Sequence, residues 1–303
     1  MNARMFRRQL QIQYKTPEQI ALMRRAGLLV ARALAAMRPA VAPGVTTADL
    51  DAIAEGVIRE AGGVPSFKGY HGYPATICSS VNEQIVHAIP SPKQVLRDGD
   101  LISIDCGAIL DGWHGDAAIS VLVGSNGGSG GGSNGGSGGG PDRDGRQRLV
   151  DAADEALWTG IAAAARSVRS GRGRLSDISA AIEASIRAHR FGIVRGYGGH
   201  GIGSEMHQEP FVLNHGRAGR GPRLVPGMCL AIEPMLTIGS PRSVELSDGW
   251  TVVTADGSVA AHVEHSVALF DDGVWVLTAE DGGAERLGDL LASAADGVLL
   301  PEQ

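Results

Sequence analysis

Four carboxylates and one imidazole of this chain stand in apolar surroundings, where a charged side chain is uncommon unless it is paired or binds a metal. Asp105 and Asp116 lie in one strand-like stretch, Glu233 and Glu264 lie in two later ones, and His200 stands among four glycines. Oxygen-rich sets with a single histidine suit divalent ions such as Mn, Fe, Co or Zn. Because four negative charges balance two divalent ions, the set favours a pair of metals, which turns water into a nucleophile at neutral pH. Taken one at a time, each of these residues also has a purely structural explanation.

The stretch 101–123 predicts how the two aspartates are placed. It reads as two apolar strands joined at Asp111-Gly112, a dipeptide that suits a tight type I′ turn because both central residues need a positive φ. With that turn Asp105 pairs with Ala118, and Asp105 and Asp116 become diagonal neighbours on one face, about 7–8 Å apart at Cα. Their repulsion and desolvation indicate a cation beside them. The alternative is that one carboxylate caps a turn while the other faces solvent.

Two pairs of predicted helices must position these strands. Thr16-Pro17-Glu18-Gln19 begins a helix with a capping box, and a second helix is predicted from residue 47 to about 61. A further pair is predicted over 147–168 and 176–189, and strand-like segments follow each pair. The order helix–helix–strands therefore occurs twice, about 130 residues apart, which predicts a pseudo-symmetric α+β domain.

Composition excludes several classes of protein. The 303 residues are 43 % hydrophobic and 20 % charged, which is typical of a globular domain rather than a disordered chain. The net charge of −6 argues against a chain that coats nucleic acid, and no apolar run reaches the ~18 residues of a membrane span or resembles a signal peptide. The three cysteines, Cys78, Cys106 and Cys229, form no CxxC motif, which argues against disulfides and indicates a reducing, cytoplasmic setting.

Two segments differ from the rest of the chain. Residues 1–15 carry Arg4, Arg7, Arg8 and Lys15 without an acidic residue, and form either a solvated basic arm or a contact to ribosomal RNA. Residues 125–140 are SNGGSGGG written twice, which predicts a flexible surface insertion. Whether this insertion is natural or an engineered linker stays open.

Several longer motifs identify a resemblance to a known family. The chain resembles the pita-bread metallopeptidases, and within them the type I methionine aminopeptidases, over roughly residues 16–280. The motifs that carry the resemblance are GYHGYPATICSSVNEQIVHAIP (69–90), LISIDCG (101–107), WHGDAA (113–118), GYGGHGIGSEMHQEP (196–210), AIEPM (231–235), GWTVVTADGS (249–258) and HVEHSVAL (262–269). The resemblance implies a single catalytic domain over 16–280, with a pseudo-two-fold antiparallel sheet covered by two helix pairs. The arm 1–15 precedes this domain and a tail, 281–303, follows it.

The resemblance also implies a role for each metal-facing residue. Asp116 and Glu264 would bridge two divalent ions, His200 and Glu233 would bind the first ion, and Asp105 would bind the second. The bridging hydroxide would attack the scissile carbonyl, with Glu233 accepting and donating the proton. The free α-amine of the substrate would complete the shell of the second ion.

Substrate-binding residues follow from the same resemblance. His207 would stabilise the oxyanion by a hydrogen bond, and His87 would hold the amide of the second substrate residue, although a lone histidine in such an apolar stretch is more often a core residue. The methionine pocket would be formed by Tyr70, Tyr73, Cys78, Met206 and Trp250, since rings and soft sulfur atoms suit a thioether. Met206 and Phe67 depart from the family, whose bacterial members commonly have an aromatic residue and a cysteine there.

The expected function is removal of the N-terminal methionine from nascent proteins and peptides with a small second residue. The expected protein is a cytoplasmic monomer that binds no membrane and no specific nucleic-acid sequence. One alternative is a proline-specific peptidase, such as aminopeptidase P or prolidase, which shares the five ligands. Those enzymes usually carry a large N-terminal domain, for which the 104 residues before Asp105 leave little room. The other alternative is a non-enzymatic binding module, but such relatives lose ligands that are all present here.

Overall fold

The structure is a computed structural model that describes residues 11–124 and 143–294. The first ten residues of the expected basic arm, the Gly/Ser insertion and residues 295–303 of the expected tail lie outside the described residues. Within the described part, no helix combines the length and apolar character that crossing a membrane would require.

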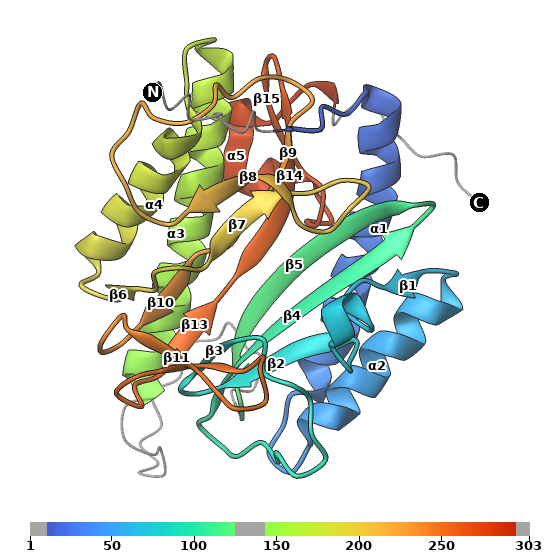
Figure 1. Cartoon of the computed structure of the whole chain (residues 1–303), viewed down its shortest axis with the longest axis vertical. Helices are drawn as coiled ribbons and strands as arrows, with labels where there is room; N and C mark the ends of the chain where they lie inside the picture. The colour runs from blue at the N-terminus through green and yellow to red at the C-terminus, as the bar shows by residue number, and fades with distance from the viewer. Residues whose placement is uncertain (1–10, 125–142, 295–303) are drawn as a thin grey trace, which may run out of the picture.

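The four long helices form two pairs, as the sequence predicts (Figure 1). Helix α1 (Pro17–Met37) begins at Thr16 with the expected capping box, and α2 (Thr47–Glu60) begins at Thr46 with a second one. Helices α3 (Arg143–Arg169) and α4 (Leu175–Ala188) form the second pair. The observed ends differ from the predicted ones by a few residues, since helix termini are the least determined part of such patterns.

An antiparallel sheet of nine strands, counted over the described residues, forms the centre of the molecule (Figure 1). Its strands run in the order β1-β4-β5-β14-β9-β7-β8, while β2 also pairs with β4 and β15 with β14. The bounds are β1 (Val64–Pro65), β2 (Ile77–Val81), β4 (Leu101–Leu110), β5 (Trp113–Leu122), β7 (Gly198–Gly201), β8 (Gln208–Leu213), β9 (Cys229–Ile232), β14 (Glu264–Phe270) and β15 (Gly273–Val276).

Two smaller sheets and four short helices complete the described part. The first small sheet contains β6 (Gly192–Ile193), β10 (Met235–Thr237) and β13 (Ala260–His262), and the second contains β3 (Gln84–Val86), β11 (Ser243–Glu245) and β12 (Val252–Thr254). The short helices are η1 (Arg38–Ala40), η2 (Tyr70–Gly72), α5 (Ala284–Leu287) and η3 (Gly288–Leu290).

The hairpin of β4 and β5 has the predicted register. Asp111 and Gly112 have φ angles of 52° and 79°, as a type I′ turn requires, and Asp105 pairs with Ala118 while Gly107 pairs with Asp116. The two aspartates therefore share a face of the sheet.

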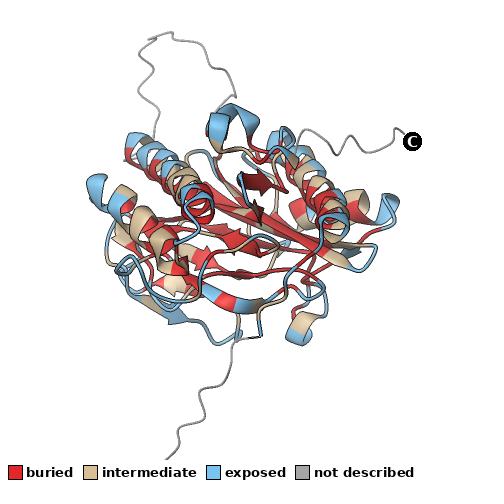
Figure 2. Cartoon of the chain, turned by 90° about the horizontal axis from the view of Figure 1, so that it is seen from above, coloured by how far each residue is buried: buried red, intermediate tan, exposed pale blue. Residues whose placement is uncertain are grey.

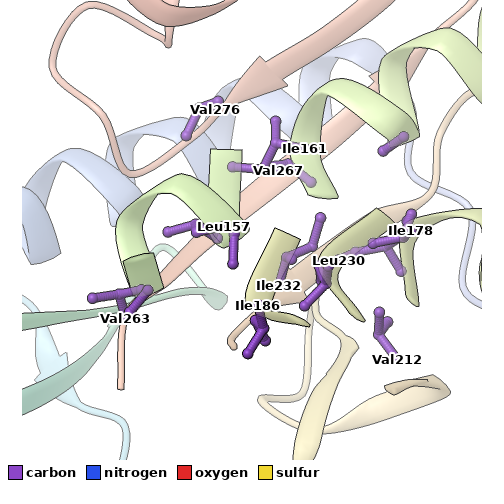
Figure 3. Close-up of a cluster of buried hydrophobic side chains, with 14 of the residues drawn as sticks. Leu157, Ile161, Ile178, Ile186, Val212, Leu230, Ile232, Val263, Val267 and Val276 are labelled. Atoms are coloured by element: carbon purple, nitrogen blue, oxygen red, sulfur yellow. The ribbon is translucent and has the colours of Figure 1, made fainter. Parts of the chain in front are cut away.

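Each helix pair covers one half of the sheet with its own hydrophobic core. Below α3 and α4, Leu157, Ile161 and Ile178 pack against Leu230 and Val267 of the sheet (Figure 3). A second core joins α1 and α2 to β2, β4 and β5 through residues such as Leu29, Leu50 and Ile104. Figure 2 shows that the helices bury their inner faces against the sheet and expose their outer ones. One face of the sheet is thus covered by the helices, and the opposite face is not used for helix packing.

The two ends of the described chain are tied to this body. The amide of Lys15 donates to the Gly227 carbonyl oxygen at 2.7 Å, and Ile12 forms an isolated bridge with Glu209. Leu287, in the expected C-terminal tail, is buried in the core below α3, and Leu291 forms a bridge with Val274. The described parts of the arm and the tail therefore pack on the expected catalytic unit, and the division into arm, domain and tail stays a prediction.

Candidate metal centre and active site

Strand pairing places all five predicted metal-facing residues on the same face of the sheet. Ala118 pairs with Asp105 on one side and with Glu264 on the other. Ala231 pairs likewise with His200 and with Ser266. Directly paired residues and residues two apart on a strand share a face, so Asp116 joins this set through Ala118. Glu233 lies directly after β9, two residues beyond Ala231, and its side chain reaches the same cluster.

Four of the five side chains, all except that of Asp105, fall into two overlapping groups that could hold a metal ion. Ligand atoms of Asp116, His200 and Glu264 lie within 4.8 Å of one another, and so do those of Glu233, His262 and Glu264. Glu264, whose side chain is only 2 % exposed, belongs to both groups. Either group could hold a metal ion, and the Glu264 carboxylate is common to both.

The electrostatics of the cluster fit a bound cation. Asp105 Oδ1, Asp116 Oδ1 and Glu264 Oε1 are buried and have no hydrogen-bond partner among the described residues. Burial raises the pKa of Asp105 to about 7, and burial together with repulsion from the neighbouring carboxylates raises the pKa values of Asp116 and Glu264 well above their usual range. A cation would remove this penalty, and carboxylate oxygens with an imidazole are a donor set that divalent metals accept.

His200 is oriented as a ligand would be. Its Nδ1–H donates to the carbonyl oxygen of Gly201 at 3.0 Å, which leaves Nε2 free to bind. Glycines surround it because β7 is squeezed between β8 and β9: a Cβ on Gly199 or Gly201 would overlap the backbone of a neighbouring strand.

Glu233 has a different environment from the other carboxylates. Burial alone would raise its pKa, but the nearby imidazoles of His262, His200 and His87 outweigh this effect and lower the pKa. Its backbone is fixed as well, because Asn214 Nδ2 donates to the Glu233 carbonyl oxygen at 2.9 Å. Glu233 is therefore the carboxylate of the cluster that holds its negative charge most readily.

A cavity next to the carboxylates brings together every predicted pocket residue. It is lined by the cluster itself, by His87 and His207, and by Phe67, Tyr70, Tyr73, Cys78, Met206 and Trp250. Tyr73 and Trp250 pack edge to face with ring centroids 5.0 Å apart, and the Tyr73 hydroxyl donates to the carbonyl oxygen of Ile77 at 3.0 Å. Burial raises the pKa of Cys78 well above its usual range, so this residue is a neutral thiol in an apolar wall.

The two auxiliary histidines also reach this cavity. His207 Nδ1 lies 2.9 Å from the Tyr70 hydroxyl, and its ring centroid is 4.3 Å from that of His200. Burial and the neighbouring imidazoles lower the pKa of His207 to about 4, so its ring is neutral at pH 7. His87 lines both this cavity and a second groove, and it has a left-handed φ of 61°. Residues with such a backbone cluster at functional sites, and the role of His87 stays a prediction.

Sequence reasoning missed His262 and placed His265 correctly. His262 is 1 % exposed and belongs to one of the two possible metal-binding groups. His262 could have been found from the sequence, because it lies two residues before Glu264 and residues two apart on a strand share a face. His265, one residue beyond Glu264, points to the other side, where Nδ1 lies 2.8 Å from Thr278 Oγ1.

Comparison with known proteins identifies the class to which this geometry belongs. The sequence matches Metallopeptidase family M24 over residues 21–269, a range that includes all five metal-facing residues. The chain belongs to this family of metal-dependent hydrolases.

Within this family the chain is similar to methionine aminopeptidases. It is 53 % identical to methionine aminopeptidase 1 of Mycobacterium tuberculosis over 262 residues, which cover 84 % of this chain and 91 % of that relative. The crystal structure of methionine aminopeptidase from Rickettsia prowazekii matches 88 % of this chain and 100 % of its own, with a TM-score of 0.79 and 34 % identity. These matches confirm the predicted pita-bread fold and the predicted family.

A prolidase from Pyrococcus horikoshii has the same fold but much less sequence in common. Its TM-score is 0.64 at 17 % identity, and the match covers 88 % of this chain and 63 % of that one. This likeness concerns the fold alone, so the comparisons favour the methionine aminopeptidases over the proline-specific enzymes.

Proposed function

We propose that this chain releases the N-terminal methionine from peptides and nascent proteins whose second residue is small. The observation that carries the proposal is that one cavity joins the carboxylate cluster to a wall of aromatic rings and sulfur atoms. A methionine side chain fits such a wall because its thioether is polarisable and packs well against ring edges. The identity to methionine aminopeptidases supports the same substrate.

The proposed cofactor is a pair of divalent ions, drawn from Mn, Fe, Co and Zn. In this assignment Asp116 and Glu264 would hold both ions, His200 and Glu233 would help to hold the first, and Asp105 would help to hold the second. The unpartnered oxygens of Asp105, Asp116 and Glu264 support it. When bound, such ions lower the pKa of water enough to supply a nucleophile at neutral pH and polarise the scissile carbonyl.

Glu233 is the residue to which we assign proton transfer. Its carboxylate accepts a proton from the attacking water and delivers it to the nitrogen of the departing chain. The lowered pKa of Glu233 supports this role, because the proton acceptor must be ionised when the reaction begins.

His207 and His87 hold the peptide that is cleaved. When the Tyr70 hydroxyl donates to His207 Nδ1, the neutral ring carries its proton on Nε2 and donates it to the scissile carbonyl oxygen. His87 holds the amide of the second residue, since it lines both the methionine cavity and the groove that leads away from Glu233. Tyr197 and Met235 are among the residues that line that groove, where the second residue would lie.

The working state that we propose is a cytoplasmic monomer acting on chains as they are made. The basic arm would bring the enzyme to ribosomal RNA, and no bound membrane or specific nucleic-acid sequence is required. Sedimentation of the purified chain, with and without ribosomes, tests the oligomeric state and the ribosome contact together.

Mass spectrometry of peptide cleavage tests the proposed activity. Metal-stripped protein is supplied with Mn²⁺ or Co²⁺ and then with Met-Ala-Ser and Ala-Pro-Ser. Release of methionine alone, and only with metal, is the expected result. Cleavage of the Ala-Pro bond would instead move the chain to the proline-specific enzymes, and no cleavage despite metal binding would favour a binding module.

A further inference from the structure

His262 occupies a position beside the metal centre that none of the assigned roles explains. It lies at the end of β13, is 1 % exposed, and its Nε2 is 3.2 Å from Glu233 Oε2. This is an ion-pair distance, while neither ring nitrogen of His262 has a hydrogen-bond partner among the described residues. A buried imidazole without a partner beside a buried carboxylate is expected to turn its N–H toward that carboxylate.

The two carboxylate oxygens of Glu233 face different histidines. Glu233 Oε1 lies 3.7 Å from His200 Nε2, which is a separation expected of two atoms that bind one ion rather than each other. Glu233 Oε2 faces His262. We propose that His262 is a positioning residue: its Nε2–H donates to Glu233 Oε2 and so turns Oε1 toward the ion that His200 binds.

The backbone of His262 is held firmly enough to do this. Its amide donates to the hydroxyl oxygens of Ser103 and Ser120, both at 3.1 Å, and its carbonyl oxygen accepts a 2.8 Å hydrogen bond from Ser120. The two serines are themselves 2.8 Å apart and lie on β4 and β5, the strands that carry Asp105 and Asp116. His262 therefore links the hairpin that supplies two ligands to the carboxylate that supplies a third.

Residues that donate a hydrogen bond to a metal ligand change the metal affinity without binding the ion themselves. A carboxylate whose second oxygen is hydrogen-bonded loses less freedom when it binds an ion, and removing such a partner typically weakens metal affinity about 10–100-fold. The inference rests on the proposed role of Glu233 as a ligand, but it does not depend on which peptide is cleaved.

Titration of the metal-stripped chain with Co²⁺, followed by calorimetry, tests the inference. His262→Leu removes the donor, and we expect the tighter Co²⁺ affinity to fall about 10–100-fold. His262→Gln restores an N–H at similar reach, and we expect its affinity to return to within about 3-fold of the parent. His265→Gln is the matched control, because it alters a half-buried histidine of β14 whose side chain points away from the carboxylate cluster toward Thr278, and it should leave Co²⁺ affinity unchanged. If His262→Leu does not fold, His262→Asn takes its place, since the shorter amide cannot reach Glu233.

X-ray absorption of the Co²⁺-loaded chains separates a positioning residue from a direct ligand. A positioning role predicts the same imidazole scattering in the parent and in His262→Gln, because His200 supplies it in both. Loss of half of that scattering in His262→Gln would overturn the proposal and make His262 a ligand. Equal Co²⁺ affinity in His262→Leu and the parent would also overturn it. These measurements need no cleavage, so failure of the chain to release methionine would be distinguishable from either result.

Discussion

The two halves of the sheet present their metal-facing residues in different ways. In the first half, Asp105 and Asp116 lie on one continuous hairpin of two ten-residue strands. In the second half, His200 and Glu264 lie on the separate strands β7 and β14, and Glu233 follows directly after β9. The first arrangement is fixed by a two-residue turn, whereas the second exists only when strands far apart in the sequence are already packed together.

This difference shows which part of the site depends on the rest of the molecule. The aspartates need only their hairpin to become neighbours, so their relative position is a local property of the chain. The second-half residues rely on additional contacts, such as the hydrogen bonds from Asn214 to the backbone of Glu233 and from His200 to Gly201. Changes in the second half should therefore disturb chemistry and metal binding most.

The largest effect that we expect is on turnover, from Glu233→Gln. The amide cannot accept the proton from water, so kcat should fall about 100- to 10,000-fold while the fold survives. Methionine release, metal content and thermal unfolding should be measured on the same preparation. Glu60→Gln is the control, because Glu60 is exposed at the end of α2 and lines neither the cavity nor the groove. Near-normal activity of Glu233→Gln would exclude the proton-transfer role.

Metal removal should lower the local stability of the second half of the sheet more than that of the first half. At a free metal concentration of 100 times Kd, binding adds about 2.7 kcal/mol to the free energy of unfolding, which a chelator takes away. Amide hydrogen exchange should show where this stabilisation acts. We expect chelation to speed exchange in β7 and β9 more than in the β4–β5 hairpin, whose amides are paired along its whole length. Equal acceleration in both halves would contradict the idea that only the second half depends on non-local support.

Two helical glycines test how the halves are joined. A Cβ on Gly27 of α1 would overlap the carbonyl oxygen of Leu277 in the second half, whereas a Cβ on Gly56 of α2 would meet no atom within 4 Å. Gly27→Ala should therefore lower the free energy of unfolding by about 1–3 kcal/mol. Gly56→Ala should raise it by about 0.5–1 kcal/mol, since alanine is the better helix former. Denaturant unfolding of both variants checks the pair, and equal shifts would mean that α1 can move away from Leu277 without cost.

More of the first half of the site than of the second half could be predicted from the sequence, because local rules fix the first half and long-range packing fixes the second. The hairpin register, the helix caps and the opposite directions of Glu264 and His265 follow from local rules of turns, caps and strand alternation. The five metal-facing residues are recognisable by type, but their convergence required either the family resemblance or the structure. The register shift between Gly199 and Gly201, beside His200, and the contact between His262 and Glu233 depend on long-range packing, which no local pattern encodes.

The smallest effect that we expect concerns a hydrogen bond between the halves. The Tyr70 hydroxyl, from the first half, lies 2.9 Å from Nδ1 of His207, from the second. Tyr70→Phe keeps the ring in the methionine pocket but removes this contact, which is worth about 1 kcal/mol, so kcat/KM should fall about 5-fold. If the hydroxyl orients His207 toward the scissile carbonyl, the loss should appear in kcat, whereas a role in binding methionine alone should raise KM and leave kcat unchanged. Tyr73→Phe is a useful contrast, because its hydroxyl bonds to the backbone of Ile77 within the first half. If only Tyr70→Phe lowers kcat, the first half contributes to the chemistry through the hydrogen bond between Tyr70 and His207 of the second half.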